Sequence, residues 1–247
     1  MDSGLDTTLF FVIFLAATFV AALVAGLAGF AFGLVAAAMW LYVLTPLQSA
    51  TLIIWFGLVV QGYAVWKLRQ AISWGRIVPL MFGAAFGVPL GVFVLSSVSA
   101  QHLRTGVGVV LVFYSLHGLL RPSMKPVTGG GMAADAGAGF LNGALGGATG
   151  FAGIIATIWC QLRGWSKDQQ RAVFQPVGVA TFAMSAAWLG GQGAISRDVI
   201  WLFGLGLPLL LAGTWAGLRL YGKLDDTQFR KIVLALLLAS GVVLLLR

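Results

Sequence analysis

The side chains that usually perform catalysis are few in this chain and lie too far apart to act together. His102 and His117 stand fifteen residues apart on one predicted helix, about 22 Å along its axis, so they cannot share a metal ion or a substrate proton. The single cysteine, Cys160, excludes an internal disulfide and a cysteine-based metal cluster. All seven acidic residues are aspartates expected at helix ends or in loops: Asp2, Asp6, Asp135, Asp168, Asp198, Asp225 and Asp226. We therefore expect no enzyme, no metal site and no cofactor.

Glycines are the residues whose spacing is most informative, because they precede two short apolar segments. Gly26, Gly29 and Gly33 interrupt one stretch, and glycines recur 117 residues later at positions 143, 146 and 150. The segments that follow, 33–45 and 150–162, each hold about a dozen residues, or about 18 Å of helix, which is well short of the hydrocarbon core. We predict two re-entrant hairpins that enter the membrane from opposite faces and turn inside it.

A hairpin turn of this kind suits an anion. It leaves the first N–H groups of the following half-helix unpaired and directs the positive end of the helix dipole into a cavity. Two such ends predict one central anion site near the bilayer midplane, with Asn142 and Thr149 adding side-chain hydrogen bonds. The candidate substrate-binding residues are Gly26, Gly29, Phe30, Gly33, Asn142, Gly143, Gly146, Gly147, Thr149, Gly150 and Gln175. The alternative for the hairpin glycines is close helix packing, the interpretation we favour for Gly87, Gly91, Gly213 and Gly217.

Charged groups contribute little to the predicted site. No Lys or Arg is expected in the middle of a segment, so the backbone is expected to bind the anion. Arg171 lies at a predicted helix end, where snorkelling to the interface is the expected behaviour and attraction of anions into an inner vestibule is the alternative. Without a carboxylate in mid-membrane, no coupling site is predicted. An anion leaving a negatively charged interior gains about 2.3 kcal/mol per charge per 100 mV, which favours export.

The elements that position these residues are membrane helices. Of the 247 residues, 60% are apolar and 9% charged, against about 45–50% and about 25% in soluble domains. We predict an all-α, polytopic membrane protein of eight to ten segments, and apolar runs lie near residues 8–26, 31–45, 49–66, 77–96, 102–120, 133–146, 150–162, 172–190, 198–218 and 228–246. The net charge of +8 is carried by residues scattered between these runs, which indicates a topology signal and not nucleic-acid binding.

The two sets of five segments resemble one another. Residues 1–121 form the first predicted repeat, 122–132 a cytoplasmic linker and 133–247 the second repeat. Because five is odd, the second copy must enter the membrane inverted. With the amino terminus outside, twelve Lys and Arg residues fall at cytoplasmic ends and only Arg104, Arg197 and Arg247 fall outside. The charges therefore place both termini in the periplasm, in a cell inner membrane. An array of ordinary helices without inverted symmetry is the alternative.

Three runs carry a resemblance to a known family: GLAGFAFG from Gly26, GALGGATGFAG from Gly143, and GWSKDQQRAVFQ from Gly164. Together they resemble the sulfite exporter TauE/SafE family of membrane permeases over essentially the whole chain. The resemblance implies transport, often outward, of small sulfur-containing anions such as sulfite, sulfoacetate or sulfolactate. The sequence departs from many members by lacking a proline near Ile154 or Ile155.

Two other functions stay open at this point. One is a non-transporting membrane subunit or scaffold that needs a partner, and the other is a permease for an anion without sulfur. The expected partners are a small anion and the lipid bilayer, with no nucleic acid; the oligomeric state is not predicted.

Overall fold

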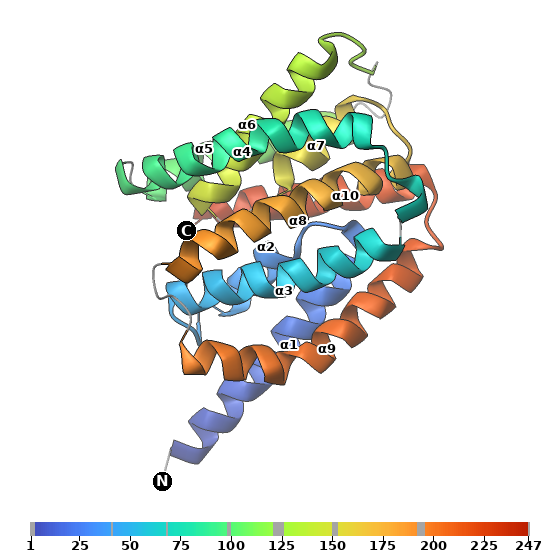
Figure 1. The fold of residues 1–247 in the computed structure, drawn as a ribbon. Helices are drawn as coiled ribbons and strands as arrows, with labels where there is room; N and C mark the ends of the chain where they lie inside the picture. The colour runs from blue at the N-terminus through green and yellow to red at the C-terminus, as the bar shows by residue number, and fades with distance from the viewer. Residues whose placement is uncertain are drawn as a thin grey trace. The chain divides into compact units, whose positions relative to one another are not determined.

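A computed structural model describes residues 3–40, 42–67, 69–97, 100–120, 126–149, 153–191 and 196–246 (Figure 1). These residues form ten α-helices and a short 3₁₀ helix, Arg69–Ala71. The α-helices are α1 (Ser3–Ala28), α2 (Phe32–Trp40), α3 (Pro46–Lys67), α4 (Trp74–Ser97), α5 (Ala100–Leu120), α6 (Gly131–Thr149), α7 (Ile154–Leu162), α8 (Lys167–Gly191), α9 (Arg197–Tyr221) and α10 (Asp226–Leu246). Each of the ten predicted segments overlaps one of them, so the all-helical prediction is confirmed.

Several helices are long and apolar enough to cross a membrane. Within the described part of the chain, three meet both criteria: Thr7–Ala28, Gln48–Lys67 and Arg197–Tyr221. A crossing needs about 20 apolar residues. In contrast, α2 and α7 hold nine residues each, or about 13 Å of helix. The prediction of one short segment after each glycine break is therefore confirmed in length.

The helices group into two compact units, each drawn from both halves of the sequence. Unit 1 comprises Met1–Lys67 and Phe182–Lys223, and so combines α1, α2 and α3 with α9. Unit 2 comprises Leu68–Thr181 and Leu224–Arg247, and so combines α6, α7 and the first part of α8 with α4, α5 and α10. In each unit, the first helices of one sequence half are joined by the fourth helix of the other half. The predicted division into a first repeat (1–121), a linker (122–132) and a second repeat (133–247) concerns the order of segments along the chain, and it stays a prediction.

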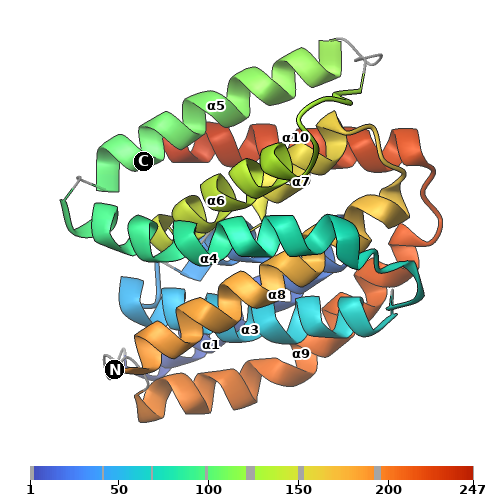
Figure 2. The ribbon, with the colours of Figure 1, turned by 45° about the horizontal axis from the view of Figure 1, so that its top comes forward.

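Glycines bring α4 and α6 into close contact within unit 2 (Figure 2). A Cβ atom added at Gly87 would lie 2.1 Å from the carbonyl oxygen of Phe140, and one at Gly91 would lie 2.1 Å from that of Ala144. Gly83 and Gly139 make equally close backbone contacts across the same pair of helices. Such small residues let helix backbones approach closely in a membrane.

The same kind of contact joins α1 and α9 within unit 1. A Cβ at Gly213 would lie 2.6 Å from the carbonyl oxygen of Phe19, and one at Gly217 would lie 2.2 Å from that of Leu23. The packing role predicted for Gly87, Gly91, Gly213 and Gly217 is confirmed.

Candidate functional site

The second hairpin turns between the end of α6 and the start of α7, and the side chain of Asn142 holds this turn together. Gly153, the residue before α7, has a φ of 98°, which only glycine adopts without strain. The Asn142 Oδ1 atom accepts hydrogen bonds from the backbone N–H of Gly153, at 3.1 Å, and of Ala156, at 3.2 Å. An asparagine on α6 thus caps the half-helix α7, supplying an acceptor that the helix end lacks.

The amino end of α7 retains hydrogen-bond donors. Asn142 is completely buried, and its Nδ2 atom has no partner among the described residues. The N–H groups of Ile154 and Ile155 lie in the first turn, where no intrahelical acceptor exists, and no described residue accepts from them. A buried donor without an acceptor costs about 1–3 kcal/mol. Donors at the positive end of a helix dipole can bind an oxyanion.

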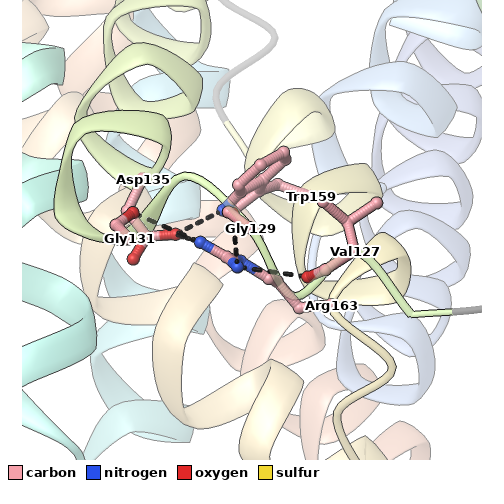
Figure 3. Close-up of polar contacts among 6 residues, drawn as sticks. All are labelled: Val127, Gly129, Gly131, Asp135, Trp159 and Arg163. Carbon is pink, nitrogen blue, oxygen red and sulfur yellow. Dashed lines mark hydrogen bonds and ion pairs between the residues drawn. The ribbon is translucent and has the colours of Figure 1, made fainter.

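The open end of this hairpin is closed by an ion pair (Figure 3). Arg163, just after α7, lies 2.8 Å from the Oδ1 atom of Asp135 in the second turn of α6, with both side chains about nine-tenths buried. The same oxygen accepts from Trp159 Nε1 at 2.8 Å, and the guanidinium lies over the Trp159 ring. Arg163 also donates to the carbonyl oxygens of Val127, Gly129 and Gly131. These contacts join the end of α7 to the beginning of α6, so the chain leaves the hairpin close to where it entered.

The sequence did not indicate this cluster. The sequence predicts Asp135 and Arg163 at the ends of membrane segments, but it does not predict that they pair. The only available signal was the hairpin itself, since a chain that enters and returns must bring residues before and after the turn to one level.

The first hairpin has a similar outline but an apolar interior. Gly29, directly after α1, has a φ of 92° and donates to the Ala25 carbonyl oxygen at 2.6 Å. The Trp40 ring at the end of α2 stacks on Phe14, with centroids 5.3 Å apart, and its Nε1 atom lies 3.4 Å from the Phe14 carbonyl oxygen. The ring of Phe32, in the first turn of α2, lies 5.8 Å from that of Trp40. Aromatic packing therefore closes this hairpin where an ion pair closes the second.

The predicted site residues fall into distinct environments. Gly26, Gly143 and Gly147 face neighbouring helices: an added Cβ would lie about 2.5 Å from the carbonyl oxygens of Thr214, Ala84 and Val88 respectively. Close packing explains these three glycines without a ligand, and their contact with substrate stays a prediction. Gly29, Phe30, Gly33 and Gly146 are buried near the two turns. The Thr149 side chain and Gly150 lie outside the described residues.

The helix bounds offer a second way to match the two predicted repeats. From α1 to α6 the helix starts differ by 128 residues and the ends by 121, and from α2 to α7 both bounds differ by 122. The glycine spacing of 117 residues differs from the values at the helix ends by about one helical turn, and the repeat itself stays a prediction. Matched by helix ends, Asn142, seven residues before the end of α6, corresponds to Ala21, which is also completely buried.

Gln175 lies beside an arginine that the sequence did not place in the interior. Both Arg171 and Gln175 are completely buried on α8. With its amide oxygen turned toward the guanidinium, Gln175 accepts from Arg171 Nε at 3.3 Å and from Nη2 at 2.9 Å. The expectation that Arg171 snorkels to the interface is wrong, because every residue from 171 to 178 is buried. Arg171 lies in the second turn of α8, so the expectation that no Lys or Arg occupies the middle of a segment stays a prediction.

Metal ligands are not gathered anywhere in the described ranges: no three His, Cys, Asp or Glu side chains there lie close enough to hold a metal ion. The groups without a described acceptor at the turn of the second hairpin are the Asn142 amide and the backbone N–H groups that begin α7. They suit reversible binding of an anion.

Comparisons with known proteins support a family but give no individual relative. Neither the curated proteins nor the solved structures include a match to this chain. A family model described as "Sulfite exporter TauE/SafE" matches residues 14–244. The match begins within α1 and ends within α10, so it spans the fold described above. The chain is therefore a multi-pass membrane transporter, not an enzyme, and belongs to the sulfite exporter TauE/SafE family.

Proposed function

We propose that this protein exports small sulfur-containing anions, such as sulfite or organosulfonates, across the inner membrane, and that it binds the anion at the amino end of a half-helix near the bilayer midplane. The observation that carries this proposal is the donor-rich end of α7, where N–H groups and a buried amide face a turn without a described acceptor. Family membership supports the class of substrate.

The same proposal includes an inverted arrangement of the two sequence halves. The helix lengths support it: α2 and α7 each have nine residues, and α5 and α10 each have 21. The pairing of helices supports it as well, because exchange of the halves converts the α1–α9 contact into the α6–α4 contact. Under this arrangement, the charge distribution supports a topology with both termini in the periplasm.

Export is the proposed direction because the membrane potential drives it. The carboxylate of Asp135 on α6 is held by Arg163 at the open end of the second hairpin. No described feature requires a coupled proton or cation, and expulsion of an anion from a negative interior gains about 2.3 kcal/mol per charge per 100 mV.

Counterflow in liposomes tests the proposal. Purified protein alone is reconstituted in vesicles loaded with unlabelled sulfite, and uptake of labelled sulfite is followed. We expect accumulation that unlabelled sulfonates inhibit and chloride does not. If the vesicles accumulate neither sulfite nor any sulfonate but do accumulate another anion, the chain is a permease for a different substrate. If no anion moves unless a partner is added, the scaffold interpretation replaces the proposal, although family membership argues against it.

A further inference from the structure

We propose that Asn142 is a specificity-determining residue of the anion site, and that it recognises substrate through its Nδ2 donor while its Oδ1 atom holds the α7 end in place. This inference rests on the proposed function, because it concerns the same anion site. Beyond that function, the inference names the Asn142 Nδ2 atom as the recognising donor, gives its orientation, and states which chemical class of ligand it selects.

The orientation of the Asn142 amide follows from its two hydrogen bonds. The N–H groups of Gly153 and Ala156 require an acceptor, so Oδ1 must be the atom that faces them. The Nδ2 atom then lies on the other side of the amide group, at a completely buried position and without a described partner. The turn therefore holds a donor in one orientation before any ligand arrives, and such preorganisation reduces the cost of binding.

Donors of three kinds lie near this end of α7: the Asn142 amide, the N–H groups of Ile154 and Ile155, and the positive end of the helix dipole. A sulfite or sulfonate group presents only acceptor oxygens and a negative charge, so it matches all three. A cation would meet only donors and be disfavoured. The selected class is thus a small anion with acceptor oxygens.

The next helix of the same unit carries a buried cation. Figures 1 and 2 show α8 running back from the loop after α7 in the opposite direction. Arg171 and Gln175 are completely buried in the first part of this helix, and the Gln175 amide oxygen accepts from the guanidinium.

The first hairpin has no comparable group in its described part. Ala21 occupies the position that corresponds to Asn142, and the rings of Phe14, Phe32 and Trp40 fill the interior nearby. The two hairpins therefore differ in their described interiors: the second holds a buried donor, and the first is packed with apolar side chains.

One experiment observes the donor directly in the unmodified protein. Asn142 is the only asparagine in the sequence, so incorporation of ¹⁵N-asparagine gives a single side-chain NH₂ signal pair by NMR of detergent-purified protein. We expect a saturable shift of this pair as sodium sulfite is added, and no comparable shift with sodium chloride. If sulfite raises the thermal stability of the protein but leaves the Asn142 NH₂ signals unchanged, the inference fails and the proposed function stands. If no sulfur anion stabilises the protein or is transported, the proposed function itself fails.

A pair of variants separates recognition from capping. Asn142→Asp retains an oxygen that can accept from Gly153 and Ala156, so the turn should keep its cap, but it replaces the donor with a charged acceptor. At a pH well above the ordinary pKa of aspartate, we expect at least a hundredfold loss of sulfite affinity with near-normal thermal stability. Asn142→Ala should lose both the cap and the donor. Sulfite binding by Asn142→Asp with unchanged affinity would show that Asn142 only caps the helix. If Asn142→Asp does not fold, the ¹⁵N measurement on the wild type decides.

Discussion

At the scale of single residues, a buried arginine is the largest departure from what the sequence led us to expect. Arg171 is completely buried on α8, with the Gln175 amide oxygen as one acceptor. Removing a buried charge from water is costly unless it is hydrogen-bonded, and the contact with Gln175 offsets part of that cost. If the proposed export of anions is correct, this positive charge should also attract substrate.

Arg171→Gln should therefore lower sulfite flux by about tenfold to a hundredfold, the range expected when a hydrogen bond to a charged group is lost. Arg171→Lys keeps the charge but not the two-nitrogen contact with Gln175, so its sulfite flux should lie between that of the wild type and that of Arg171→Gln. Flux per folded protein in liposomes is the measurement. A variant that unfolds at lower temperature but transports normally once folded would show that Arg171 serves the fold alone.

Asn142 and Gln175 are candidates from the sequence, because Asn142 lies beside the second glycine break and Gln175 ends the run GWSKDQQRAVFQ. Their contact with substrate stays a prediction, and the direction of each amide depends on partners that the fold supplies. The sequence predicts Arg171 at a helix end because the apolar run begins only at residue 172. The true start of α8 at Lys167 is five residues earlier than predicted, which moves Arg171 from the predicted end into the second turn.

At the scale of elements, glycines separate into those that pack helices and those that form turns. Gly143 packs against α4, where an added Cβ would lie 2.4 Å from the Ala84 carbonyl oxygen. Gly137 is on the same helix, and an added Cβ there would meet nothing within 4 Å. These two positions give a matched comparison on one helix.

Gly143→Ala should destabilise the protein, because α4 and α6 must move apart to admit the methyl group and lose close contacts. Overpacking of this kind typically costs about 1–3 kcal/mol. Gly137→Ala should stabilise by up to about 1 kcal/mol, since alanine restricts the unfolded chain and favours a helix. Thermal unfolding in detergent measures both. Equal responses of the two variants would contradict the assignment of Gly143 to the α4 contact.

The existence and order of the helices were predictable, because apolar runs of the required length are separated by charges and glycines. The half-length of α2 and α7 was predictable for the same reason. The sequence alone does not define one register between the halves, because abundant glycine allows matches at several spacings. The closure of one hairpin by aromatic rings and of the other by an ion pair depends on which side chains face inward after folding.

At the scale of the whole molecule, the two units do not follow the sequence halves. Helix α9 joins α1, α2 and α3, while α4 joins α6 and α7. Hydropathy gives no information about which helices pack together, because every apolar helix suits the membrane equally. The paired glycines on α1 and α9 and on α4 and α6 were the available clue, but a small-residue motif on one helix does not identify its partner.

The proposed topology predicts the labelling of surface cysteines. In a Cys160→Ala background, Tyr42→Cys lies in the exposed loop between α2 and α3, and Lys223→Cys lies in the exposed loop before α10. A membrane-impermeant thiol reagent applied to intact cells with a permeable outer membrane should label position 42 at once. It should label position 223 only after the inner membrane is broken. The reverse pattern would place the termini in the cytoplasm, and equal labelling of both loops would remove the proposed inversion.

The central claim, that a small sulfur anion binds at the turn of the second hairpin, is tested most directly by sulfite-induced thermal stabilisation of purified protein. Specific binding to the folded state raises its apparent stability in proportion to RT ln(1 + [L]/Kd). Gly146 is buried one turn before the end of α6, and Gly146→Leu should obstruct the turn and abolish the sulfite-induced shift. Gly137→Leu, on the open face of the same helix, should retain it. A folded Gly146→Leu protein that shows the full shift and still transports sulfite would contradict the hairpin site.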